Sequence, residues 1–140
     1  MEQVEKESKQ KFFTELRVYR DMAQKGREQL DNALAEINAK RDVTALVYVK
    51  QATSFFEDTR TKVVDMRNNR TPSTYQSRID DLLRSLEQFI EASKQFRNVV
   101  FLLEDQNSSE FTNGLGKGKT ALVNASSYLS GVSDLIASNP

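Results

Sequence analysis

The stretch FFTELRVYRDMAQKGREQLDNALAEI, residues 12–37, decides the fold class. Apolar or small residues recur along it at alternating intervals of four and three residues: Phe12, Leu16, Tyr19, Ala23, Gly26, Leu30, Ala33 and Ile37. These intervals place all of them on one face of an α-helix, whereas a strand needs alternation every two residues. Because the repeat averages about 3.5 residues, a left-handed supercoil keeps this seam facing neighbouring helices.

Three further seams follow the same pattern along the rest of the 140 residues. They consist, in chain order, of Ala45, Val49, Ala52, Phe56, Thr59, Val63 and Met66; of Tyr75, Ile79, Leu82, Leu86, Phe89, Ser93, Phe96, Val100 and Leu103; and of Phe111, Leu115, Gly118, Leu122, Ala125, Leu129, Val132 and Ile136. The polar connections between seams are short, so consecutive helices are expected to lie antiparallel. The sequence therefore predicts an all-α, left-handed, antiparallel up-down-up-down four-helix bundle over residues 11–138. Residues 1–10 are predicted to be a polar tether or a frayed start of the first helix.

The connections also contain residues that favour helix starts, because their side chains accept hydrogen bonds from unpaired amides at a helix N-terminus. The candidate caps are Asp42 for the second helix, Thr71 or Ser73 for the third, and Ser108 or Ser109 for the fourth.

Composition excludes most catalytic chemistry. The chain has no Cys and no His, and its 20 Lys and Arg residues balance 20 Asp and Glu residues. Without thiols or imidazoles there is no zinc, haem or iron–sulfur site and no Cys or His catalytic group, and none of the seam positions is Asp or Glu. We therefore expect no enzyme, no metal and no cofactor. Zero net charge argues against nucleic acid as a partner, and the apolar runs are too short to cross a membrane.

Two charged or glycine-rich stretches resemble ligand sites. Residues 114–120, GLGKGKT, end like a phosphate-binding loop, but Asn113 stands where the first glycine of that motif belongs and no strand precedes it. A small core glycine at Gly118 is the preferred interpretation. The basic residues near the end of the second helix, Arg60 to Arg70, alternate with acidic ones and favour a solvated helix end over an anion site.

One apolar feature is not explained by the seams. Phe101 and Leu102 fall at outward positions of the third helix, and Val47 is outward near the start of the second, at the same end of the expected bundle. These three residues are a candidate interaction patch, the alternative being that the neighbouring connections cover them.

A second candidate site is a pocket between helices. Gly26 and Ala125 are expected at the same level as Phe56 and Phe89, and the phenyl rings are predicted to fill the space beside the small residues. If a cavity exists there instead, its lining is predicted to consist of Tyr19, Gly26, Phe56, Phe89, Leu122 and Ala125.

Residues 102–111, LLEDQNSSEF, join a long amphipathic helix to a second one with the seam LGKGKTALVNASSYLSGV, residues 115–132. In this style the chain resembles the helical-bundle ectodomains of small bacterial envelope lipoproteins, although it lacks their lipid-attachment Cys. The resemblance implies an extracytoplasmic, non-enzymatic binding or scaffolding role through contact with another protein. The alternatives are a ligand-binding sensor and a cytoplasmic adaptor or inhibitor. Because the wide apolar stripes can be buried within one chain, we expect a monomer or weak self-association.

Overall fold

The computed structural model describes the backbone of residues 2–140 and the side chains of residues 6–140; Met1 and the side chains of residues 2–5, which belong to the predicted tether, lie outside the described part. The chain is all-helical, with four long helices, α1 (Glu2–Asn38), α2 (Asp42–Arg70), α3 (Gln76–Val100) and α4 (Ser109–Ala137). Two short 3₁₀ turns, η1 (Ser73–Tyr75) and η2 (Leu103–Asp105), lie in the connections. The all-α prediction is confirmed.

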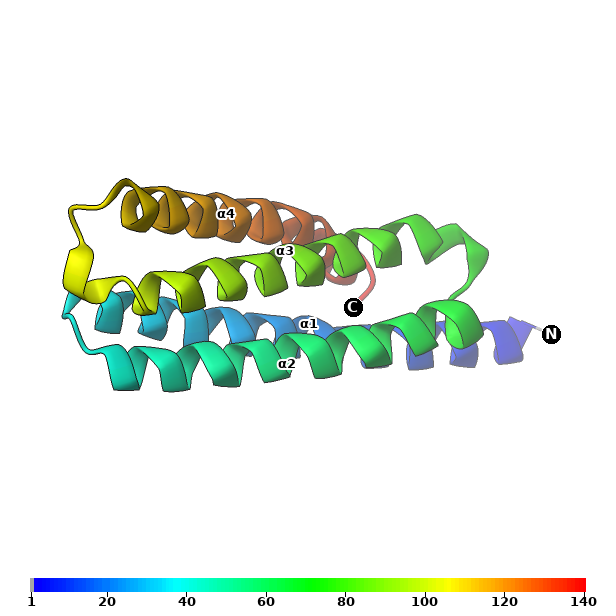
Figure 1. Cartoon of the computed structure of the whole chain (residues 1–140). Coiled ribbons are helices and arrows are strands. Elements are labelled where there is room, and N and C mark those ends of the chain that lie inside the picture. The colour runs from blue at the N-terminus through cyan, green and yellow to red at the C-terminus, as the bar shows by residue number, and fades with distance from the viewer. Residues whose placement is uncertain (1) are drawn as a thin grey trace.

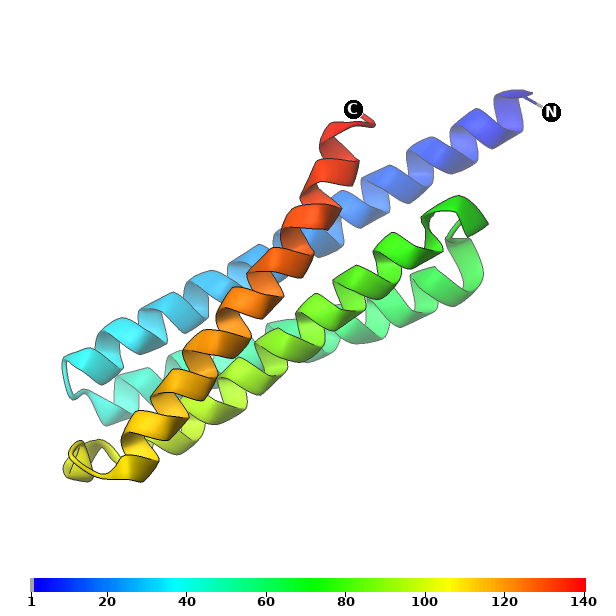
Figure 2. The same cartoon turned by 90° about the horizontal axis from the view of Figure 1, so that it is seen from above.

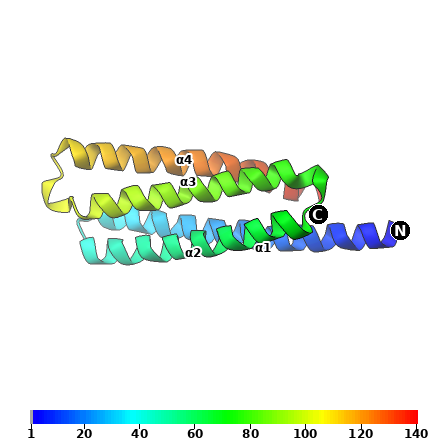
Figure 3. The same cartoon turned by 45° about the vertical axis from the view of Figure 1, so that its right-hand side comes forward.

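The four helices form an elongated rod (Figure 1). The connections after α1 and after α3 lie at one end, and the connection after α2 lies at the other. The most extensive packing joins α3 to α4 and α1 to α2, and α2 packs on α3 to join the two pairs. Seen from above, α4 follows α3 and crosses over α1 toward its own C-terminal end (Figure 2). The first turns of α1 project beyond the other helices (Figure 3), and the described side chains of residues 6–11 in this segment are exposed.

The predicted seams form the core. In α2 the buried residues are the seven predicted ones. The seam of α1 is also buried, except for the half-buried Tyr19. The helix α3 packs extensively on both α2 and α4 and therefore buries a wider stripe, which adds Ser85, Ala92 and Val99 to the predicted seam.

The buried hydroxyl groups are satisfied by backbone carbonyls, as burial in an apolar core requires. Thr59 and Ser93 donate to carbonyls one turn earlier in their own helices. The Ser85 hydroxyl instead crosses from α3 to α4 and donates to the carbonyl of Ala125 at 2.7 Å. This bond fixes the register between the two helices.

The predicted caps have mixed outcomes. Ser108 caps α4, because its hydroxyl oxygen accepts from the amide of Phe111 at 3.1 Å. The prediction for Thr71 is wrong: its hydroxyl donates to the carbonyl of Met66 and thus closes the end of α2. Pro72 precedes the 3₁₀ turn without a side-chain cap. Asp42 is the first residue of α2 rather than its cap, and its carboxylate accepts from the adjacent amide of Val43.

Candidate functional site

Two of the most exposed large apolar side chains, Val43 and Phe101, lie at the end of the rod that contains two connections. A groove of about 780 Å³, which we call the hairpin-end groove, lies between the start of α2 and the end of α3. It is lined by Lys40, Asp42, Val43, Leu46, Val100, Phe101, Leu103 and Glu104. Val43 is 73% exposed and Phe101 is 66% exposed. Both side chains line the same groove, so apolar surface is exposed to water at this place.

The predicted patch is only partly brought together. Phe101 lies just beyond the last residue of α3 and lines the hairpin-end groove, and Val47 is exposed on α2. Leu102 is half-buried, packs against the core and lines a different depression, between α3 and α4. Val43 was missed by sequence reasoning, although it precedes the outward Val47 by one helical turn and therefore lies on the same face.

The rim of this groove contains a backbone conformation that L-residues rarely adopt. Lys40 has φ of 61°, in the left-handed region. Its amide donates to the carbonyl of Ile37, and the amide of Arg41 donates to the carbonyl of Glu36, at 3.0 and 2.9 Å. These two bonds form a Schellman motif, whose left-handed position is usually glycine. A lysine there costs on the order of 1 kcal/mol, so the sharp turn keeps a charged side chain on the rim at the expense of stability.

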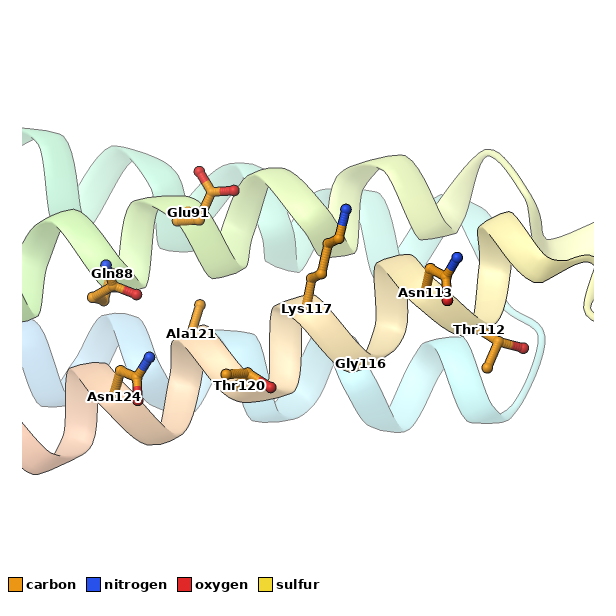
Figure 4. A pocket seen from close by; sticks show the side chains of 9 residues that line it. All are labelled: Gln88, Glu91, Thr112, Asn113, Gly116, Lys117, Thr120, Ala121 and Asn124. Carbon is orange, nitrogen blue, oxygen red and sulfur yellow. The ribbon is translucent and has the colours of Figure 1, made fainter.

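A second groove runs along the outer face between α3 and α4. Its main part is open to solvent, has a volume of about 530 Å³ and is lined by Gln88, Glu91, Thr112, Asn113, Gly116, Lys117, Thr120, Ala121 and Asn124 (Figure 4). We call it the amide groove, because amide side chains from both helices line it. A second depression, of about 360 Å³, continues from it at Gln88 and Asn124 and adds Ser127 and Tyr128. Sequence reasoning did not find this groove, because its residues come from two helices and share no motif.

The space beside Gly26, where a pocket was the alternative to close packing, is occupied by the ring of Phe56. A Cβ atom on Gly26 would lie 2.7 Å from Cζ of Phe56, so the ring fills the space that the glycine leaves. Phe56 stacks on Phe89 with 4.8 Å between ring centroids, and both rings are fully buried. This is the large-against-small packing that the sequence predicted for Phe56. A second pair of this kind, Gly118 against Phe96, was not predicted.

The other residues considered for a pocket lining, Tyr19, Leu122 and Ala125, make different contacts from those of the Phe56–Phe89 stack. Tyr19 and Leu122 are half-buried at the edge of the core. Ala125 is buried, and its carbonyl accepts the hydroxyl of Ser85. The hydroxyl of Tyr19 donates to the carboxylate of Glu15 at 2.6 Å. These contacts are those of a packed core.

Ion pairs join the helices near the α2–α3 connection. The guanidinium of Arg70 donates to both carboxylate oxygens of Glu15 on α1, at 3.0 and 2.7 Å, and to Asp65 on its own helix. It thereby lowers the pKa of Glu15 and of Asp65. Burial, reinforced by the hydrogen bond to Glu15, raises the pKa of Tyr19 to about 12. The cluster fastens α1 to α2.

The neighbouring cations are paired too. Arg67 binds Asp80 on α3 and lowers the pKa of that carboxyl group, and Arg60 lies 3.7 Å from Glu87. Three of the basic residues considered for an anion site are therefore already neutralised by helix-to-helix pairs. The sequence-based preference for a solvated helix end agrees with these contacts.

The phosphate-loop interpretation of residues 114–120 has no geometric basis. Residues 114–120 lie within α4 instead of in a loop, and Gly118 is buried against Phe96. Within residues 6–140, no group of three acidic side chains is placed to hold a metal ion. No helix in the described part of the chain is long and apolar enough to cross a membrane.

Comparison with protein families, with curated proteins and with solved structures finds no significant match for this chain. The two grooves are therefore the features of the molecule from which a function is inferred.

Proposed function

We propose that the protein is a non-enzymatic binding or scaffolding protein that acts by contact with another protein through the hairpin-end groove, at the cell envelope. The observation that carries this proposal is the pair of large apolar side chains, Val43 and Phe101, exposed side by side in one groove. Elsewhere, exposed apolar residues such as Val18 and Val123 are not part of the hairpin-end groove. Isolated exposed apolar residues need no explanation, but apolar residues gathered in one groove do.

The rim of the groove adds specificity to this apolar contact. Lys40, Asp42 and Glu104 place both signs of charge around the apolar floor. Arg41 is already engaged with Glu36 at 3.4 Å, which leaves Lys40 as the unpaired cation of the rim. Charged rims fix orientation and exclude wrong partners more than they add affinity. The envelope location is supported only by the resemblance to lipoprotein ectodomains, which consists of long amphipathic helices joined by a short polar connection.

The proposed scaffold is an antiparallel, left-handed four-helix bundle that is monomeric or weakly self-associating. The seam repeat of about 3.5 residues and the short connections support this arrangement. A rod of this kind presents its connections at its ends, away from the core. The hairpin-end groove then serves as the contact surface while the seams maintain the fold.

The test is affinity capture with the intact protein, comparing the native chain with the variants Phe101→Ser and Val43→Ser. A partner that binds through this groove is expected to be retained by the native chain and lost from both variants. The matched control is Val123→Ser, since Val123 is 68% exposed on α4 and lies outside the groove. Capture that survives both groove variants would contradict the proposal, as would capture lost equally with the control.

A further inference from the structure

The amide groove presents polar side chains that have no partner within the chain. Gln88 on α3 and Asn124 on α4 extend into the same groove (Figure 4). Neither side chain makes a hydrogen bond, ion pair or ring contact with another described residue, and the same holds for Asn113 and Thr120. Amide and hydroxyl groups both donate and accept, so they match a ligand whose own groups do both.

The lining of the groove has no net charge and therefore does not favour an ionic ligand. It contains one carboxylate, Glu91, and one ammonium group, Lys117, which cancel. The carboxylate of Glu91 also accepts from the amide of Gln95 at 2.9 Å. A nucleic acid or another polyanion needs a basic excess that this groove lacks. A docking helix needs a row of apolar anchors, and among the described residues that line the main part of the groove Ala121 is the only one with an apolar side chain.

Two features of the groove suit a ring-shaped ligand: open space at Gly116 and an exposed aromatic ring at Tyr128. A Cβ atom on Gly116 would meet nothing within 4 Å, so the backbone of α4 is open to close approach there. Tyr128 is 38% exposed and lines the continuation of the groove together with Gln88 and Asn124. Its phenol ring offers an apolar face with a polar edge beside the two amides.

We propose that the amide groove binds a neutral oligosaccharide. Sugar hydroxyl groups both donate and accept hydrogen bonds, which is what the unpaired amides of Gln88 and Asn124 supply. The C–H face of a pyranose ring packs on an aromatic ring, which is the contact that Tyr128 offers. From Thr112 to Tyr128 the groove follows α4 for about 24 Å at 1.5 Å per residue, so it accommodates several linked rings rather than one. The site is separate from the hairpin-end groove and does not depend on the proposed protein contact.

The experiment is titration of the intact, ¹⁵N-labelled protein with three neutral hexasaccharides: chitohexaose, cellohexaose and maltohexaose. At least one is expected to produce saturable shifts of amide signals along residues 112–128 and around Gln88. The variants Asn124→Ala and Tyr128→Ala are expected to weaken that binding at least tenfold. Because both residues are exposed, their thermal unfolding is expected to match that of the native chain.

The matched control is Gln51→Ala, which removes an exposed amide from α2, away from the groove, and is expected to leave binding unchanged. The proposal is overturned if none of the three hexasaccharides produces saturable shifts at millimolar concentration, or if the shifts lie outside the groove. It is equally overturned if Asn124→Ala and Tyr128→Ala bind as tightly as the control. Tighter binding of the anionic oligogalacturonate at the same residues would contradict the choice of a neutral ligand.

Discussion

Replacing Gly26 by alanine tests how tightly the centre of the rod is packed. The added Cβ would lie 2.7 Å from Cζ and 2.9 Å from Cδ1 of Phe56, closer than real contacts of this kind. The ring has little freedom to move, because it is fully buried and stacked on Phe89 with an interplanar angle of 3°. The substitution therefore forces the ring or the α1–α2 spacing to shift.

The expected magnitude combines two opposing terms. Replacing a helical glycine by alanine stabilises a protein by about 0.5–1 kcal/mol, because the unfolded chain loses conformational freedom. Overpacking a core costs about 1–3 kcal/mol. We expect the second term to win and Gly26→Ala to lower the free energy of unfolding by about 1 kcal/mol, which is a few degrees in Tm for a chain of this size.

Gly116→Ala is the matched control, since the same change is made in a helix where a Cβ would meet nothing within 4 Å. It is expected to raise the free energy of unfolding by about 0.5–1 kcal/mol. Urea unfolding followed by far-ultraviolet circular dichroism measures both variants. A shorter partner, Phe56→Leu, is expected to be less damaging in the Gly26→Ala background than in the native one. If Gly26→Ala proves as stabilising as Gly116→Ala, the packing argument is refuted and there is free space at that level.

Further predictions concern single contacts. Gly118→Ala, which meets a buried ring in the same way, is expected to lower the urea midpoint. Ser108→Ala removes the cap of α4 and is expected to cost about 1 kcal/mol, whereas Ser109→Ala, the alternative cap from the sequence, serves as a control with a smaller effect. Lys40→Gly relieves the left-handed backbone and is expected to raise Tm; a fall in Tm would show that the lysine side chain makes a stabilising contact. Stability is expected to be flat between pH 6 and 8 and to fall in acid. The lowered pKa of Glu15 contributes stability that is present above the pKa of the unfolded chain, about 4.3, and is lost as pH falls through the folded value. Arg70→Met is expected to make the acid branch of a pH–Tm profile shallower, and an unchanged profile would show that the pair contributes nothing.

The fold class was predictable because the apolar period is a local property. Every seam residue of α2 was identified from spacing alone, since a 3.5-residue repeat brings one set of side chains to one face whatever lies opposite. The cap at Ser108 was predictable for the same reason, because capping depends on residues within one turn. Thr71 was misassigned because it lies between two helices and its hydroxyl can bond to either; in the structure it donates to the carbonyl of Met66.

The two grooves were decided by tertiary structure. Phe101 and Val47 were recognised as outward, but Val43 lines the same groove as Phe101 only because α2 packs on α3 with its start beside the end of α3. The amide groove is even harder to predict from the sequence pattern, because Gln88 and Asn124 belong to different helices and each resembles an ordinary surface residue. Periodicity reports which face of a helix is buried, because burial repeats along the chain. It does not report which polar faces of two helices meet, because that depends on the angle and register of packing, here fixed by contacts such as Ser85 to Ala125.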